Sequence, residues 1–188
     1  MVSEEKIVKD CISGKRYAFD LLYKKYAASM LGLCMRYCKN KAEAEDVLQE
    51  GFIKVFKNIC KFRQDGSFEG WMKRIMVNTS INNYYANIKH NNKISIDENI
   101  ENIFSDEDDN NIDVENGDIS KGQMMELIQE LPDGYRIVFN LYVFEDYSHK
   151  EIAEMINVSE NTSKSQLSKA RKSLRKKIIK IREEILVS

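Results

Sequence analysis

Two asparagines, Asn78 and Asn82, stand four residues apart in a segment that we expect to be helical over residues 68–89. Asparagine is a poor residue in the middle of a helix, and its amide both donates and accepts hydrogen bonds, which suits the edges of nucleic-acid bases. Cations that follow a backbone, with aromatic rings nearby, are typical of single-stranded DNA sites. The same composition also fits a solvated helix with two satisfied amides. The cations and rings on other faces of this segment are Lys73, Arg74, Tyr84 and Tyr85.

A second group of polar side chains lies near the C-terminus. Ser148 and Glu151 match a capping box, which begins a helix, and the pattern breaks at residues 157–159 before a long helix from Glu160 to about Arg182. A helix, a three-residue turn and a basic helix are typical of a helix-turn-helix. The expected outward face has small polar residues first, which suit base edges, and lysines later, which suit phosphates: Asn161, Thr162, Ser165, Lys169, Lys172 and Lys176.

One apolar residue lies on the polar side of an expected helix over residues 41–59. Ile53 shares that side with Asp46, Glu50 and Lys57, and Gln49 is at its margin. An exposed apolar side chain ringed by acids and an amide is a candidate protein-docking site. A single exposed isoleucine is also common on protein surfaces.

The cysteines raise the alternative of a redox or metal protein, because Cys34 and Cys38 lie four residues apart on an expected helix and Cys60 follows. No CxxC pair or histidine partner completes a zinc set. His90 and His149 are far apart and suggest no catalytic triad. We therefore expect reduced thiols, no metal, no cofactor and no catalytic residue.

Composition favours an all-α protein. The chain has 188 residues, of which 43% are hydrophobic and 31% charged, with one proline and eight glycines. So few turn residues argue against an all-β chain. No apolar run approaches the length of a membrane-spanning helix, and residues 1–10 show no signal-peptide pattern. We expect a cytoplasmic protein without membrane insertion.

The charge divides the chain into three parts. Residues 1–92 carry a net charge of +6, residues 93–120 carry −9, and residues 121–188 carry +2. The middle part is rich in asparagine and aspartate and lacks helical periodicity, which favours a flexible acidic linker. We therefore expect two small helical domains, at 1–92 and 121–188. In the expected helices of the two domains the inward stripes include Leu22, Tyr26, Met30, Leu33 and Tyr37, and Ser163, Leu167, Ala170, Leu174 and Ile178.

Segments of both domains resemble one family. Ala44–Phe52 and Phe68–Asn78 resemble region 2 of bacterial sigma factors of the extracytoplasmic-function (ECF) group. Leu131–Pro132, Glu151–Glu154 and Asn161–Arg171 resemble region 4 of the same group. The resemblance implies an initiation factor, not an enzyme, that binds core RNA polymerase and directs it to promoter DNA. Such a factor would read the −35 element as duplex DNA and the −10 element as melted DNA.

The resemblance also implies residue roles. The residues that it implies for docking on the clamp helices of the polymerase β′ subunit are Asp46, Gln49, Glu50, Phe52 and Ile53. It places at the −10 element the 63–67 loop with Arg63, together with Asn78 and Asn82. The cations and rings around these amides extend the expected −10 site to Lys73, Arg74, Tyr84 and Tyr85. It places at the −35 element Ser159, Asn161, Thr162, Lys164, Ser165, Gln166, Lys169 and Arg171. The earlier helices of the second domain would contact the β flap, and an anti-sigma factor is a further expected class of partner.

Two positions depart from the pattern. Many members have aspartate where Asn82 stands and valine where Ser163 stands, so Asn82 shifts the expected −10 preference. Ser163 puts a polar group on an inward face, where it needs a partner. A free-standing DNA-binding regulator that uses only the second domain remains an alternative, as does the cysteine protein.

Overall fold

The computed structural model describes residues 2–63, 66–91 and 119–187. Within these ranges the regular structure consists of α-helices and one 3-10 helix, with no strand, which confirms the all-α prediction. The chain divides into two compact units, residues 1–83 and 84–188, and each is described by itself. The acidic segment at 93–120 was expected to be a linker, and its residues 93–118 lie outside the described residues.

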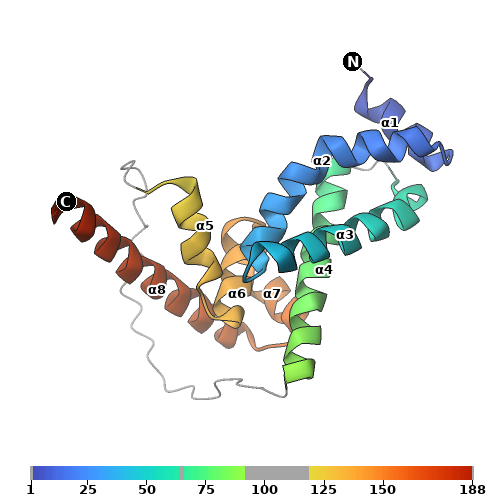
Figure 1. The fold of residues 1–188 in the computed structure, drawn as a ribbon. Helices are drawn as coiled ribbons and strands as arrows, with labels where there is room; N and C mark the ends of the chain where they lie inside the picture. The colour runs from blue at the N-terminus through green and yellow to red at the C-terminus, as the bar shows by residue number, and fades with distance from the viewer. Residues whose placement is uncertain (1, 64–65, 92–118, 188) are drawn as a thin grey trace. The chain divides into compact units, whose positions relative to one another are not determined.

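Unit 1 is a small helical bundle (Figure 1). Helices α2 and α3 pack against each other, and α1 packs against α2 and reaches the 3-10 helix η1. The three helices expected in this part are present, and each differs from its expected ends by no more than a few residues. Their bounds are α1 Glu4–Ile12, α2 Arg16–Tyr37, α3 Lys41–Asn58, η1 Ile59–Lys61 and α4 Phe68–Asn91.

Side-chain caps set where two of these helices begin. The Asn40 side chain accepts a hydrogen bond from the backbone N–H of Glu43 at 2.9 Å and starts α3. The Ser67 hydroxyl accepts one from the N–H of Gly70 at 3.0 Å, just before α4. Such caps satisfy backbone donors that have no partner inside the helix. They place α3 and α4, which carry the candidate site residues of this unit.

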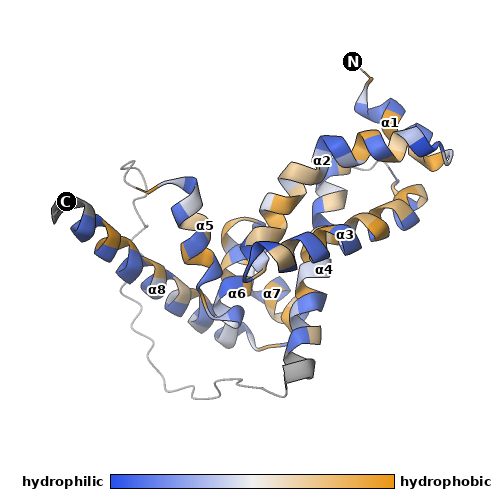
Figure 2. Cartoon of the chain, viewed as in Figure 1, coloured by the Kyte–Doolittle hydropathy of each residue, from blue (hydrophilic) through white to orange (hydrophobic). Residues whose placement is uncertain are grey.

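The core of unit 1 follows the helical stripes. Figure 2 shows their orange, hydrophobic residues alternating with blue, hydrophilic ones along α2 and α3. Phe62, Phe68 and Trp71 close one end, with ring centroids 5.2 to 5.6 Å apart. The buried side chains include Leu22, Tyr26, Met30, Leu33 and Tyr37 of α2, Val47, Leu48, Phe52 and Val55 of α3, and Met72, Met76 and Val77 of α4.

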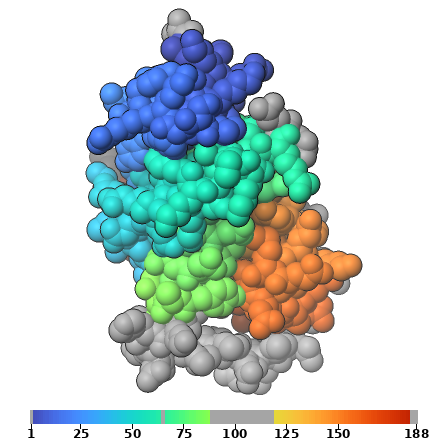
Figure 3. Space-filling model, turned by 90° about the vertical axis from the view of Figure 1, so that its right-hand side faces the viewer, coloured from blue at the N-terminus to red at the C-terminus, as the bar shows by residue number. Residues whose placement is uncertain are grey.

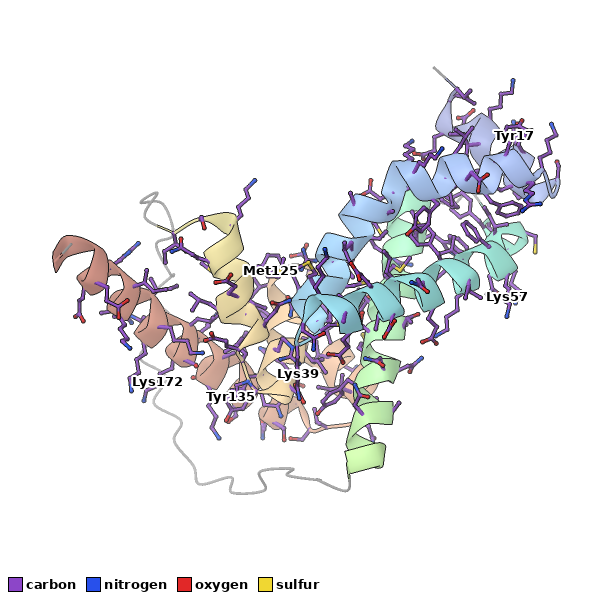
Figure 4. All side chains as sticks on the ribbon, viewed as in Figure 1. Tyr17, Lys39, Lys57, Met125, Tyr135 and Lys172 are labelled. Atoms are coloured by element: carbon purple, nitrogen blue, oxygen red, sulfur yellow. The ribbon has the colours of Figure 1, made fainter. Side chains whose placement is uncertain are left out.

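Helix α1 was not expected from the sequence. Two polar clusters fasten it to α2: Glu4 accepts hydrogen bonds from Tyr26 and, at 2.6 Å, from Lys25. Asp10 accepts them from Tyr17 and, at 2.7 Å, from Lys15. The Lys15 hydrogen bond and then the Tyr17 hydrogen bond hold the pKa of Asp10 below its usual range. Tyr17 is labelled in Figure 4, and Figure 3 shows the blue surface of α1 and α2 against the teal surface of α3.

Unit 2 contains four further helices, of which α5, α6 and α7 all contact α8. Ser148 and Glu151 form the expected capping box at the start of α7. Asn157 ends α7 in the left-handed conformation, with φ 49°, which asparagine tolerates well. The predicted helix, turn and long helix are therefore confirmed. The bounds are α5 Lys121–Gln129, α6 Asp133–Val143, α7 His149–Ile156 and α8 Glu160–Val187.

A buried arginine joins α5 to α6. Arg136 is buried, and its guanidinium donates to the backbone carbonyls of Gln129 at 2.9 Å and Leu131 at 2.8 Å. It also pairs with Asp133 at 2.5 Å. These carbonyls lie at the end of α5, where helix acceptors lack intrahelical partners. The remaining core comes from α6, α7 and α8, and includes Ile137, Val138, Leu141, Ile152, Leu167, Ala170, Leu174 and Ile178.

Candidate nucleic-acid and polymerase-binding surfaces

The first turns of α8 present small polar side chains. The Ser159 hydroxyl caps the helix by accepting a hydrogen bond from the N–H of Thr162 at 2.9 Å. Asn161 is exposed, and Thr162 and Ser165 are half-exposed. Lys164 is exposed and pairs with Glu160 at 2.9 Å. This end of α8 can therefore place hydroxyls and an amide against base edges.

Cations follow further along α8. Lys169, Lys172 and Lys176 are exposed, and Figure 4 shows Lys172 projecting away from the helix. Arg171 is half-exposed, and its guanidinium lies over the ring of Tyr142, 5.8 Å from the ring centroid. All six residues predicted for the outward face of the basic helix are therefore exposed to solvent, although Thr162 and Ser165 are exposed only in part.

Gln166 lies apart from this surface. Its amide faces the start of α6, where a Cβ added at Gly134 would lie 3.1 Å from the Gln166 Nε2. Its Oε1 is buried. Gln166, one of the eight residues expected at the −35 element, therefore has its amide turned toward α6.

The inward Ser163 has a partner that the sequence did not reveal. Its side chain is 0% exposed, and its Oγ lies 2.9 Å from Nδ1 of His149. The His149 ring stacks on Tyr142, with centroids 4.6 Å apart and planes at 23°. Burial, then the positive charge of Lys164, lowers the pKa of His149 below its usual value. A polar residue in an apolar stripe was the available signal, because it requires a buried partner.

The amides of α4 lie on the surface of unit 1. Asn78 and Asn82 are exposed, as is Arg74, and their spacing of four places the three in one row along the helix. Lys73 is half-exposed and pairs with Glu69 at 2.9 Å. Arg74, which was expected on another face of the helix, therefore lies in the same row as both asparagines, because a spacing of four residues keeps side chains on one face.

The remaining residues expected at the −10 element are less closely grouped. Arg63 is exposed, next to residues 64–65, which lie outside the described ranges. Tyr84 is half-buried and Tyr85 exposed, with ring centroids 5.2 Å apart. Both tyrosines fall in unit 2.

Helix α3 presents the expected acidic row. Asp46, Gln49 and Glu50 are exposed, and Ile53 is 51% exposed one turn further along. Phe52 differs from the expectation: it is 2% exposed, and its ring packs on Tyr23 at 4.7 Å. An aromatic ring buried in the bundle cannot also offer a surface to another protein. The candidate docking row is therefore these four exposed residues without Phe52.

Comparison with known proteins decides the family. The chain matches Sigma-70 region 2 over residues 22–87 and Sigma-70 region 4 over residues 121–174. It is 31% identical, over 180 residues and 92% of each chain, to the RNA polymerase sigma-H factor of Pseudomonas aeruginosa. The chain belongs to the sigma-70 family. This sigma factor is also 28% identical, over 182 residues, to the ECF sigma-E factor of Haemophilus influenzae, covering 94% of this chain and 96% of the relative.

A solved structure shows the same fold. The sigma factor RpoE of Bartonella quintana, in complex with the anti-sigma factor NepR, superposes with a TM-score of 0.51 at 15% identity. The match covers 84% of this chain and 94% of that one. At this identity the likeness concerns the arrangement of helices alone.

Family membership fixes the general function. The chain is an ECF-type sigma factor, a transcription initiation factor that binds core RNA polymerase and promoter DNA, and it is not an enzyme. The alternative of a regulator that uses only the second domain is wrong, because the first domain matches region 2. No helix in the described part of the chain is long and apolar enough to cross a membrane. No cluster of three metal-ligating side chains is found there either.

Proposed function

We propose that this sigma factor divides promoter reading and polymerase docking among three surfaces. The first turns of α8 read the −35 element in the major groove of duplex DNA. The row on α4 holds bases of the melted −10 element. The acidic row on α3 docks on the clamp helices of the β′ subunit, and the helices before α8 contact the β flap. The corresponding domains are residues 1–92 and 121–188.

The surface of α8 is the observation that carries this proposal. Small polar groups stand at its N-terminal end, cations follow, and no acid occurs from Asn161 to Arg182. In a helix-turn-helix the N-terminal residues of the second helix contact base edges, while cations fix the register on phosphates. Asn161 and Ser165 suit the first task, and Lys169 suits the second.

The row on α4 suits single-stranded DNA. Unstacking a base costs a few kcal/mol, which contacts of the freed base with the protein must offset. Asn78 and Asn82 can hydrogen-bond an exposed base edge, while Arg74 on the same row can pair with the backbone. Capture of bases by this row would therefore help to open the duplex.

The row on α3 suits a protein partner. Ile53 offers an apolar contact beside Gln49 and Glu50, which lie one turn before it, while Lys57 lies one turn after it. A partner with an apolar spot, and with cations that face Asp46 and Glu50, would be complementary to this row. A bacterial sigma factor binds polymerase in the cytoplasm, and we therefore propose a cytoplasmic location for this chain. The solved complex of a related fold with an anti-sigma factor supports a partner of that class here too.

Co-elution with sigma-free bacterial core polymerase on a sizing column tests the division. Ile53→Asp and Asp46→Lys should lose the complex, since they place a charge or reverse one on the α3 row. Glu45→Lys, a similar charge reversal on the neighbouring exposed residue, is the matched control and should retain it. Asn161→Ala and Lys169→Ala should keep docking while weakening −35 binding. Loss of docking in either α8 variant would contradict the division.

A further inference from the structure

We propose that Tyr142 and His149 are positioning residues that hold Arg171 ready for a phosphate of the −35 duplex. This inference rests on the proposed role of α8. Neither residue belongs to the surface that contacts DNA in that proposal. Both lie on the helices α6 and α7 that pack against α8 (Figure 1).

Four side chains form a continuous series of contacts across three helices, and both ends of the series lie on α8. Ser163 of α8 is hydrogen-bonded to His149 of α7 at 2.9 Å. His149 stacks on Tyr142 at the end of α6, with ring centroids 4.6 Å apart. Tyr142 in turn lies under the Arg171 guanidinium, 5.8 Å from its ring centroid. The two ends of this series, Ser163 and Arg171, are eight residues, or about 12 Å, apart along α8.

These contacts limit the motion of the Arg171 side chain on α8. A free arginine side chain loses rotamer entropy when it is fixed. A cation–π contact with a ring orders the side chain before a ligand binds. The guanidinium carbon lies over the ring, 5.8 Å from its centroid, and a guanidinium has N–H groups at its edge that can pair with a phosphate. Because Arg171 is half-exposed, its edge can reach a ligand.

Tyr142 is suited to this role and poorly suited to the core. It is 36% exposed, whereas Leu141 beside it is fully buried. His149 supports the ring from α7, and its bond to buried Ser163 fixes the imidazole. Lys169, Lys172 and Lys176 of α8 are exposed and carry point charges on flexible stems, whereas the Arg171 guanidinium lies over an aromatic ring.

A double-mutant cycle on the complex of full-length sigma factor and core polymerase tests the proposal. The probe is a labelled duplex that the complex itself selects from a randomised library, and affinity is measured over a range of salt concentrations. Arg171→Ala should lower the salt slope by about 1, as loss of one phosphate contact does. Tyr142→Leu should weaken binding roughly two- to fivefold, because the arginine side chain must then be ordered when DNA binds.

The cycle distinguishes positioning from folding. Once Arg171→Ala is present, Tyr142→Leu should cost nothing further, and Tyr142→Phe, which keeps the ring, should bind like the wild type. Tyr135→Leu, the same change two turns earlier on α6, should leave the salt slope unchanged. Additive losses from Tyr142→Leu and Arg171→Ala, or an unchanged affinity in Tyr142→Leu, would overturn the inference. Unchanged affinity in Asn161→Ala and Lys169→Ala would instead reject the proposed role of α8 itself.

Discussion

The hydroxyl of Ser163 lies 2.9 Å from the imidazole Nδ1 of His149 and joins the first turn of α8 to the first turn of α7. Ser163 is 0% exposed, so water does not reach its hydroxyl. A buried hydrogen bond of this kind stabilises a protein by about 1 kcal/mol, and an unpaired partner costs more. The bond therefore fixes the angle between the two helices of the helix-turn-helix.

Removing that hydroxyl should destabilise unit 2. We expect Ser163→Ala to lower the free energy of unfolding by about 1–2 kcal/mol, because His149 loses its buried partner. Thermal or urea unfolding of the full chain, followed by circular dichroism, measures this. Ser165→Ala removes a half-exposed hydroxyl two residues away and should change stability by less than about 0.5 kcal/mol. Equal losses in the two variants would contradict the role given to the bond.

His149 should also make unit 2 sensitive to mild acid. Burial, then the positive charges of Lys164 and Arg171, lowers its folded pKa, while Glu160 opposes the shift. The unfolded chain, with a histidine pKa of about 6.5, then binds more protons than the folded chain below that pH. Stability must fall as pH decreases through this window. Unfolding curves at pH 7.5 and 5.5 measure the fall.

A neutral variant isolates the histidine from the other titrating groups. His149→Gln carries no charge at either pH, so its stability should decrease less than that of the wild type between pH 7.5 and 5.5. The Tyr142 ring and the α8 charges that surround position 149 stay the same in both proteins. Parallel stability curves for wild type and variant would show that His149 does not supply the pH dependence.

Gly51 and Gly32 should respond oppositely to the same substitution. A Cβ at Gly51 would lie 2.2 Å from the Sδ of Met76, which is fully buried, whereas a Cβ at Gly32 meets nothing within 4 Å. Overpacking a core costs about 1–3 kcal/mol, and alanine in place of a helical glycine gains about 0.5–1 kcal/mol. Gly51→Ala should therefore lower the unfolding free energy and Gly32→Ala should raise it. A stabilised Gly51→Ala would mean that Met76 moves aside freely.

The cysteines should differ sharply in reactivity. Burial raises the pKa of Cys34 to about 12 and that of Cys11 to about 11, and Cys38 is also buried. Because the thiolate is the reactive form, these thiols should react slowly with a disulfide reagent at pH 8. Exposed Cys60 should give the fast phase, and Cys60→Ser should abolish it. A fast phase that persists in Cys60→Ser would revive a redox role for Cys34 and Cys38.

Much of the fold could be predicted because its helices carry clear apolar stripes and caps. The stripe from Leu22 to Tyr37 and the capping box at Ser148 gave α2 and α7 correctly. Helix α1 was missed because it is short and, unlike α7, does not begin with a capping box. Its attachment depends on Glu4 and Asp10, whose tyrosine and lysine partners on or next to α2 cannot be read from spacing.

The candidate surfaces were predictable where exposure follows helical phase. Asn78, Asn82 and Ile53 lie on the surface as their positions in the turn require. Phe52 and Gln166 differ, because tertiary neighbours decide them: Phe52 packs on Tyr23, and Gln166 turns toward Gly134. The ring stack of Tyr142 and His149 joins two helices and leaves no mark in either helix alone.

Selection of promoter DNA tests most directly whether the two units read separate elements. The sigma factor with core polymerase would be incubated with a randomised duplex library, and the retained sequences determined for wild type, Asn161→Ala and Asn82→Asp. We predict two short blocks at a fixed spacing, with Asn161→Ala changing only the upstream block and Asn82→Asp only the downstream one. A single block, or a change in the upstream block caused by Asn82→Asp, would contradict the division of promoter reading between α8 and α4.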